Sequence, residues 1–337
     1  MSCILCVLAL LALPAAAIPE DEAFDLWRVP APEGTKKTLT KDVISFTKIE
    51  GATFLQIAIY TSRPVVPGPI ENEFAKEWKE VVEANFKPGP ATKLKPRRFK
   101  CGVVSQGAMA ELKDKNDAPY YGALFVVAPY GQVVSIVVTT TTAETFKTYD
   151  PAIAAFMDSL TLDVDAIAKQ AAEKAGKVPK PEEIQGRWAT SRSGNFDPFL
   201  LGLHHGSDKR QYDFKKDGSY TFHLEAWGGS YRSDEYFVMD ENGTYAVDGN
   251  KVTVTPQAGT SVQQNRAGEI QKKYDAKLET TTYLWQFYYF TGIQENNLVL
   301  TPPGQTARDS DFASNDLFSR SYLLSAKYQP EWTKFGK

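Results

Sequence analysis

The chain has 337 residues, 42% of them hydrophobic, and a formal net charge of −3. Acidic and basic residues are interspersed, so the charge balance gives no reason to expect a nucleic-acid partner. A chain of this length and apolar content can form two ordinary hydrophobic cores. No apolar stretch long enough to span a membrane follows the N-terminal segment.

The first 17 residues predict a secretory signal peptide. Residues 4–14 form an apolar run too short to cross a bilayer, and the alanines at 15–17 are the small residues that a signal peptidase requires. One departure from the pattern is that no Lys or Arg precedes Arg28, as in an export signal that begins further upstream. The alternative to a signal peptide is a buried N-terminal strand or helix. We expect cleavage after Ala17 and a secreted or periplasmic protein. Cys101 is then the one cysteine of the mature chain, and no intramolecular disulfide is expected.

Residues 20–163 predict an α/β domain built on an antiparallel sheet. Alternating apolar and polar residues over 43–48 and 53–61 predict a hairpin, and one apolar stripe predicts a helix over 71–86. The remaining elements expected in this domain are strands over 100–112, 120–127 and 133–139 and a helix over 144–160.

This order of strands and helices resembles the PsbP-like family. The resemblance is carried by the stripe Phe74-x3-Trp78-x2-Val81-Val82, by the strands between Cys101 and Thr140, and by the segment Ala154 to Leu160. All of these are packing residues. The resemblance implies an α/β/α sandwich that acts as a binding or assembly module without catalytic residues.

Residues 164–183 predict a linker between two domains. The segment begins as a helix rich in Ala, Lys and Glu, and it breaks at Gly176, Pro179 and Pro181. We therefore expect a second domain over residues 184–330.

Short alternating strands separated by turn signals fill this second domain. The dipeptides that supply positive-φ residues for tight hairpins are Asp217-Gly218, Asn242-Gly243 and Gly249-Asn250. The strands expected from the alternation cover 211–215, 219–224, 236–239, 243–247, 251–255, 281–291, 297–301 and 317–326.

The second domain resembles the lipocalins and related calycins. Gly186-Arg187-Trp188 looks like the G-x-W that begins their first strand, and Arg320 stands where that family places a basic side chain across the tryptophan ring. The resemblance implies an up-and-down β-barrel of about eight strands, whose interior is just wide enough for side chains or one small ligand. The expected fold class is therefore α+β with two domains.

Period-two alternation indicates which aromatic side chains line this barrel. The candidate ligand-binding residues are Tyr220, Phe222, Tyr283, Trp285, Phe287 and Tyr289. Two interpretations stay open, a packed core and an open aromatic pocket. Because 281–291 is aromatic on both faces, its outer face should be covered by the first domain, by residues 262–277 or by a partner.

All three histidines lie close together in the sequence. His204, His205 and His223, with Glu225 on the same strand face as His223, are candidate metal ligands. The alternative is a solvent-facing loop followed by a polar strand residue. No cofactor is predicted, and no acid/base pair, nucleophile or phosphate loop stands out.

We therefore expect an exported, non-catalytic binding protein. Its barrel would hold a small apolar or amphipathic ligand while the α/β domain contacts a partner in the cell envelope. The alternative is a structural or assembly factor of the envelope with a filled barrel. A cavity of a few hundred Å³ distinguishes the first from the second.

Overall fold

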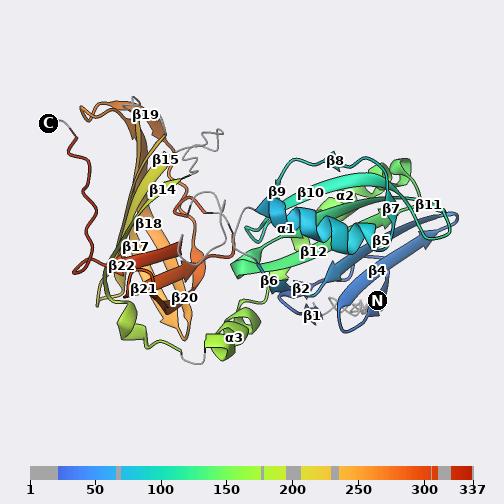
Figure 1. Cartoon of the computed structure of the whole chain (residues 1–337), viewed down its shortest axis with the longest axis horizontal. Helices are drawn as coiled ribbons and strands as arrows, with labels where there is room; N and C mark the ends of the chain where they lie inside the picture. The colour runs from blue at the N-terminus through green and yellow to red at the C-terminus, as the bar shows by residue number, and fades with distance from the viewer. Residues whose placement is uncertain are drawn as a thin grey trace, which may run out of the picture.

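The computed structural model describes residues 22–65, 70–175, 178–194, 206–228, 235–304, 306–309 and 320–335. This described part of the chain is mostly β, with an N-terminal half built on an open antiparallel sheet and a C-terminal half that forms a barrel (Figure 1). The predicted signal peptide lies outside the described residues. None of the described helices is both long and apolar enough to cross a membrane.

The N-terminal sheet has the order β3-β4-β5-β12-β11-β10-β7. The predicted hairpin is confirmed as β4 (Val43–Glu50) and β5 (Thr53–Tyr60). The three further strands predicted here are also present: β10 (Val104–Lys113), β11 (Pro119–Val127) and β12 (Gln132–Thr140). The edges are extended by β3 (Lys36–Leu39), β6 (Arg63–Pro64), β7 (Lys87–Pro88), β8 (Thr92–Lys93) and β9 (Arg97–Arg98).

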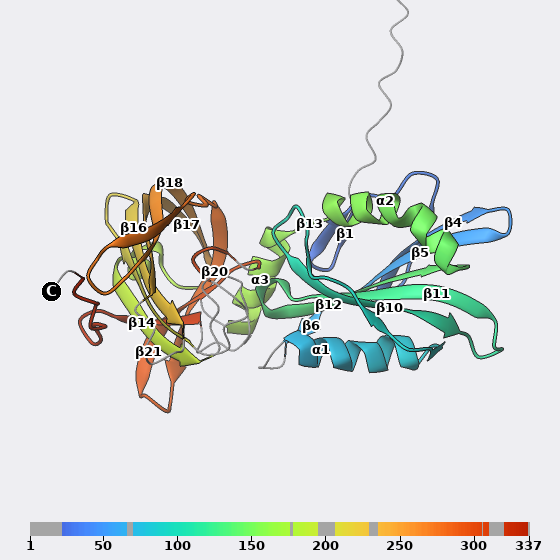
Figure 2. The same ribbon diagram turned by 90° about the horizontal axis from the view of Figure 1, so that it is seen from above.

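Two helices lie against opposite faces of this sheet (Figure 2). α1 (Ile70–Glu77) continues into a π-helical segment, Trp78–Glu83. α2 (Ala143–Ser159) begins after Thr142, whose side-chain oxygen accepts a hydrogen bond from the Thr145 amide and so caps the helix. Alternate residues of β12 pack on opposite faces of the sheet, because successive side chains of a strand point in opposite directions. Ile136 and Val138 belong to the core beneath α2, whereas Val133 and Val137 belong to the core beneath α1.

The N-terminal half also contains short strands that apolar periodicity does not predict, and a third helix. β1 (Glu22–Phe24), β2 (Trp27–Val29) and β13 (Thr161–Leu162) form a separate three-stranded sheet. The predicted linker contains α3 (Val164–Ala175), whose Ile167 and Ala168 are buried in the core beneath α2. The first part of the linker is therefore packed against the N-terminal half.

The C-terminal half is a closed barrel of eight antiparallel strands. Each barrel strand pairs with the next barrel strand along the chain, and the last pairs with the first. The barrel strands are β14 (Gly186–Gly194), β15 (Gly206–Phe214), β16 (Ser219–Gly228), β17 (Tyr236–Asp248), β18 (Lys251–Gln264), β20 (Thr281–Phe290), β21 (Glu295–Thr301) and β22 (Ser321–Leu324).

One predicted turn is wrong. The sequence predicts a turn at residues 240–242, but β17 runs unbroken through them. The pairing with β18 shifts register between Asn242 and Gly243, which marks a β-bulge. A Cβ atom at Gly243 would lie 2.1 Å from the carbonyl oxygen of Thr255, so this glycine permits a close approach of two backbones.

The two halves contact each other along β20. The Tyr130 hydroxyl, from the turn η2 (Pro129–Gly131), donates to the Thr282 carbonyl at 2.9 Å, and Leu284 packs into the N-terminal core. Asn250 Nδ2 donates to the Ala168 carbonyl of α3 at 2.9 Å. The N-terminal half therefore covers part of the outer face of β20. Residues 262–277 instead extend β18 into a hairpin with β19 (Ile270–Tyr274).

Candidate functional site

Four of the predicted ligand-binding residues lie inside the barrel and are packed there. Tyr220, Phe222, Tyr283 and Trp285 are each at most 1% exposed. The ring of Tyr212 lies 4.6 Å from the ring of Phe222, and its hydroxyl lies 3.3 Å from that of Tyr283. Tyr212 and Phe222 are paired on neighbouring strands, and the Tyr212–Tyr283 contact reaches from β15 across the interior to β20.

The other two candidates lie further along β20. Phe287 is half-buried, with its ring centre 5.7 Å from that of Trp188 and 5.8 Å from that of Trp285. Tyr289 is 51% exposed. The predicted aromatic row therefore begins inside the barrel and ends on its surface.

A buried ion pair spans the same interior. Arg308, which follows β21, is 1% exposed and donates from Nη1 to Glu241 Oε1 at 2.7 Å. Its Nη2 donates to the Glu279 carbonyl and to Thr281 Oγ1, both at 2.6 Å, and its Nε donates to the Tyr283 hydroxyl at 3.2 Å. Every nitrogen of the guanidinium is thus hydrogen-bonded, which offsets the cost of removing this charge from water.

Tyrosine hydroxyls complete this network. Burial raises the pKa of Tyr220 and of Tyr283 far above that of an exposed tyrosine, so both stay protonated and act as donors. Tyr220 donates to Glu241, and Tyr283 donates to Asp309 Oδ2 at 2.7 Å. Among the residues described, Glu241 Oε2 has no hydrogen-bond partner.

A second buried pair comes from β15. Arg210 and Asp208 are 1% and 2% exposed, and Arg210 Nε lies 2.5 Å from Asp208 Oδ2. Sequence reasoning missed both interior arginines. The alternation on β15 contained the signal, because positions 208 and 210 are in phase with the inward-facing Tyr212.

The Gly186-Arg187-Trp188 motif begins the first barrel strand. Gly186 has φ of +126°, a conformation that glycine adopts without strain. Trp188 is 6% exposed, and its Nε1 donates to the Ile184 carbonyl in the short helix η3 (Pro181–Ile184) at 2.7 Å. Arg320 is also buried, and its Nη1 lies 3.5 Å from the Cβ position of Gly131, so it reaches the N-terminal half.

Of the four candidate metal ligands, the structure describes His223 and Glu225. His204 and His205 lie outside the described residues. In the part of the chain that the structure describes, no three His, Cys, Asp or Glu side chains are grouped to hold a metal ion. His223 Nδ1 lies 2.7 Å from Asp240 Oδ1, and its Nε2 lies 3.8 Å from Glu225 Oε1. Burial opposes its charge, but these two carboxylates outweigh burial and raise its pKa to about 9.

The C-terminal segment crosses the outside of the barrel over this histidine. The Thr333 amide donates to both oxygens of Glu225, at 3.1 and 3.0 Å. The ring of Trp332 meets the His223 ring edge-on at 4.6 Å, and Lys209 Nζ donates to the Glu331 carbonyl. Contacts with β15 and β16 therefore hold residues 331–333 in place.

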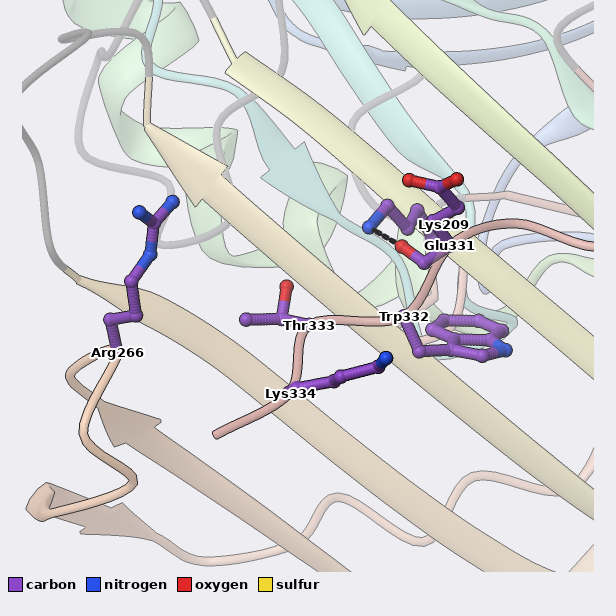
Figure 3. Close-up of a pocket in the computed structure, with 6 residues that line it drawn as sticks. All are labelled: Lys209, Arg266, Glu331, Trp332, Thr333 and Lys334. Carbon is purple, nitrogen blue, oxygen red and sulfur yellow. Dashed lines mark hydrogen bonds between the residues drawn. The ribbon is translucent and has the colours of Figure 1, made fainter. Parts of the chain in front are cut away.

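A groove of about 750 Å³ lies beside this segment. Figure 3 shows Arg266 on one side, Lys209 and Trp332 on the other, and Thr333 and Lys334 between them. Three lining residues are basic and one, Glu331, is acidic. The groove can therefore accept an anionic group next to an indole ring.

The chain matches no protein-family model and no curated protein. Within the described residues, the packed side chains of the barrel interior and the groove beside residues 331–334 are the features that bear on its function.

The raised pKa of His223 predicts a pH-dependent stability. A group with a pKa of about 9 in the folded chain and about 6.5 when unfolded stabilises the fold fully below pH 6.5 and loses this effect as pH rises through 9. Because the ring is 30% exposed, solvent screening reduces the effect to about 1 to 2 kcal/mol. Urea unfolding at about pH 6 and pH 9.5 should show this loss in the natural chain and not in His223→Gln. Equal losses in both proteins would contradict the assignment.

Proposed function

We propose that this protein is an exported, non-catalytic interaction factor of the cell envelope, and that its barrel is a filled scaffold. The observation that carries the proposal is the Arg308–Glu241 pair, which occupies the interior where a ligand would lie. An eight-stranded barrel has room for side chains or for one small ligand. Here a guanidinium, a carboxylate and several aromatic rings share that space. The proposed export is supported by the apolar run at residues 4–14 and the small residues at 15–17.

The charged groups of the interior support a structural role for it. Arg308 is paired with Glu241, and Arg210 is paired with Asp208. Charge pairs of this kind are compatible with a folded core because each ion is neutralised by its partner. A catalytic acid or base needs access to a reacting atom, and Glu241 and Arg308 are both at most 3% exposed. Interaction through outer surfaces is therefore the function that this arrangement supports best.

The fold relationships are part of the proposal. The closed eight-stranded barrel, with Gly186-Arg187-Trp188 on its first strand, supports a calycin-like domain. A helix against each face of the N-terminal antiparallel sheet supports a PsbP-like domain, a family whose members act mainly as binding or assembly modules. Both relationships are analogies of fold, and by analogy alone they favour binding or assembly over catalysis.

A thermal-shift panel tests the filled barrel. Fatty acids, sterols, quinones and haem, each at about 100 μM, should leave the Tm of the chain unchanged within about 1 °C and should not quench tryptophan emission. A ligand with a micromolar Kd would add about 2.7 kcal/mol of stability at this concentration, which is readily measured. A shift of several degrees with quenching would overturn the filled-barrel proposal.

The second candidate is the ligand container. It is favoured by Glu241 Oε2, which is buried and has no hydrogen-bond partner among the described residues. Such an oxygen can accept a hydrogen bond from the hydroxyl of an amphipathic ligand. If a compound of the panel does bind, Trp285→Leu should remove most of the quenching and leave the fold intact, whereas Trp332→Leu, outside the barrel, should not.

A further inference from the structure

The hairpin of β20 and β21 extends beyond the end of the barrel. β20 pairs with β18 only as far as Leu284, opposite Lys251, the first residue of β18. β21 pairs with β22 only at Leu298 and Val299. Among the strands that the structure describes, residues 286–297 therefore form ladder pairs only within this hairpin, and Figure 2 shows the hairpin standing out from the barrel.

The distal part of this hairpin, residues 286–297, carries exposed apolar side chains near its tip. Tyr288, Tyr289 and Ile293 are 43%, 51% and 43% exposed. The ring of Phe290 lies 4.7 Å from that of Tyr288, so the two rings form one aromatic surface. Gly292, in the turn, has nothing within 4 Å of its Cβ position, so the turn itself is unobstructed.

The tip of the hairpin carries no charge. From Thr280 to Gln294 the chain has no acidic or basic residue, although charged residues make up 23% of the whole sequence. The first charged residue after the turn, Glu295, is paired with Lys327. An uncharged tip has no ionic group that must leave water when the tip enters an apolar medium.

We infer that the tip of the β20–β21 hairpin inserts into the interface of a lipid bilayer. Tyrosine and phenylalanine are suited to this depth, where the ring is in apolar surroundings and a hydroxyl still reaches water. Tyr288 and Tyr289 are consecutive in a strand and therefore point to opposite faces of the hairpin. A fluid bilayer can surround both faces at once, whereas a protein partner would have to provide a slot that encloses a two-stranded tip.

The hairpin is held rigidly enough to present its tip. At its base, Phe287 packs between Trp188 and Trp285. Trp285 is fixed in turn because its Nε1 donates to the Gly249 carbonyl at 3.1 Å. Little conformational entropy therefore remains to be lost when the tip enters the lipid. These contacts hold whether or not the barrel contains a ligand, so bilayer binding is independent of the proposed function.

Because the tip is uncharged, we expect it to bind a bilayer whatever the charge of the lipid headgroups. An uncharged tip gains nothing from anionic headgroups, so it should bind vesicles of zwitterionic phosphatidylcholine. Its binding should be the same at about 50 mM and about 500 mM salt, because residues 280–294 contain no ionic group for salt to screen.

Flotation of the full chain with phosphatidylcholine vesicles tests this inference. We expect the natural chain to float with the vesicles and the double variant Tyr289→Ser/Ile293→Ser to bind at least about fivefold more weakly. The matched control is Ile49→Ser, which removes a side chain that is 73% exposed at the tip of the β4–β5 hairpin, and it should bind as the natural chain does. Circular dichroism checks that all three proteins are folded.

Three results would overturn the inference. The natural chain could stay in solution, the double variant could float as well as the natural chain, or high salt could abolish binding. If size-exclusion chromatography instead shows a dimer that the double variant loses, and vesicles do not bind, the tip is an interface between two copies of this chain and the bilayer assignment is wrong.

Discussion

Arg308→Met should lower the free energy of unfolding by about 3 to 5 kcal/mol. The substitution removes the guanidinium and leaves the Glu241 carboxylate buried beside Tyr220 without a compensating charge. It also leaves the Glu279 carbonyl without the hydrogen bond that Arg308 supplies. Urea denaturation followed by circular dichroism measures the loss, with the slope against urea compared between variants to confirm a two-state transition.

Two further variants show whether burial causes the effect. The double variant Arg308→Met/Glu241→Leu removes both charges, so it should recover most of the stability that the single variant loses. Arg187→Met breaks the Arg187–Asp213 pair, whose arginine is 53% exposed, and should cost less than about 1 kcal/mol. A small effect of Arg308→Met, or a double variant that is no more stable than the single one, would argue against a buried, paired charge.

Trp188→Ala should lower the free energy of unfolding by about 3 to 5 kcal/mol, because it removes a buried indole and leaves a cavity next to Phe287. Trp188→Phe keeps a large apolar ring but leaves the Ile184 carbonyl without its donor, at a cost of about 1 to 3 kcal/mol. Trp332→Ala, on the outer surface, is the matched control and should cost less than Trp188→Ala. If the two alanine variants lose equal stability, Trp188 does not anchor the end of the barrel.

The residue pattern by itself determined most of the strands and helices. Apolar periodicity is a property of neighbouring residues, so it located the hairpin at 43–61, the helix at 144–160 and the long aromatic strand at 281–291 before any tertiary contact was known. It also placed Tyr283 and Trp285 in the barrel interior, where both are buried, but it placed Tyr289 there as well, and that side chain is 51% exposed. The same local signals were misleading at Asn242-Gly243, where a bulge and a turn call for the same flexible residue.

Only the tertiary structure decided what fills and covers the barrel. Arg308 comes from a segment between strands, and nothing in its neighbours indicates that it folds back onto Glu241, which lies 67 residues earlier in the chain. Likewise, Thr333 reaches Glu225 across 108 residues. A charged residue in a sequence usually marks the surface, because burying an unpaired charge is costly. That cost is offset only when the fold brings a partner close, and such partners are set by long-range packing, which the local periodicity does not record.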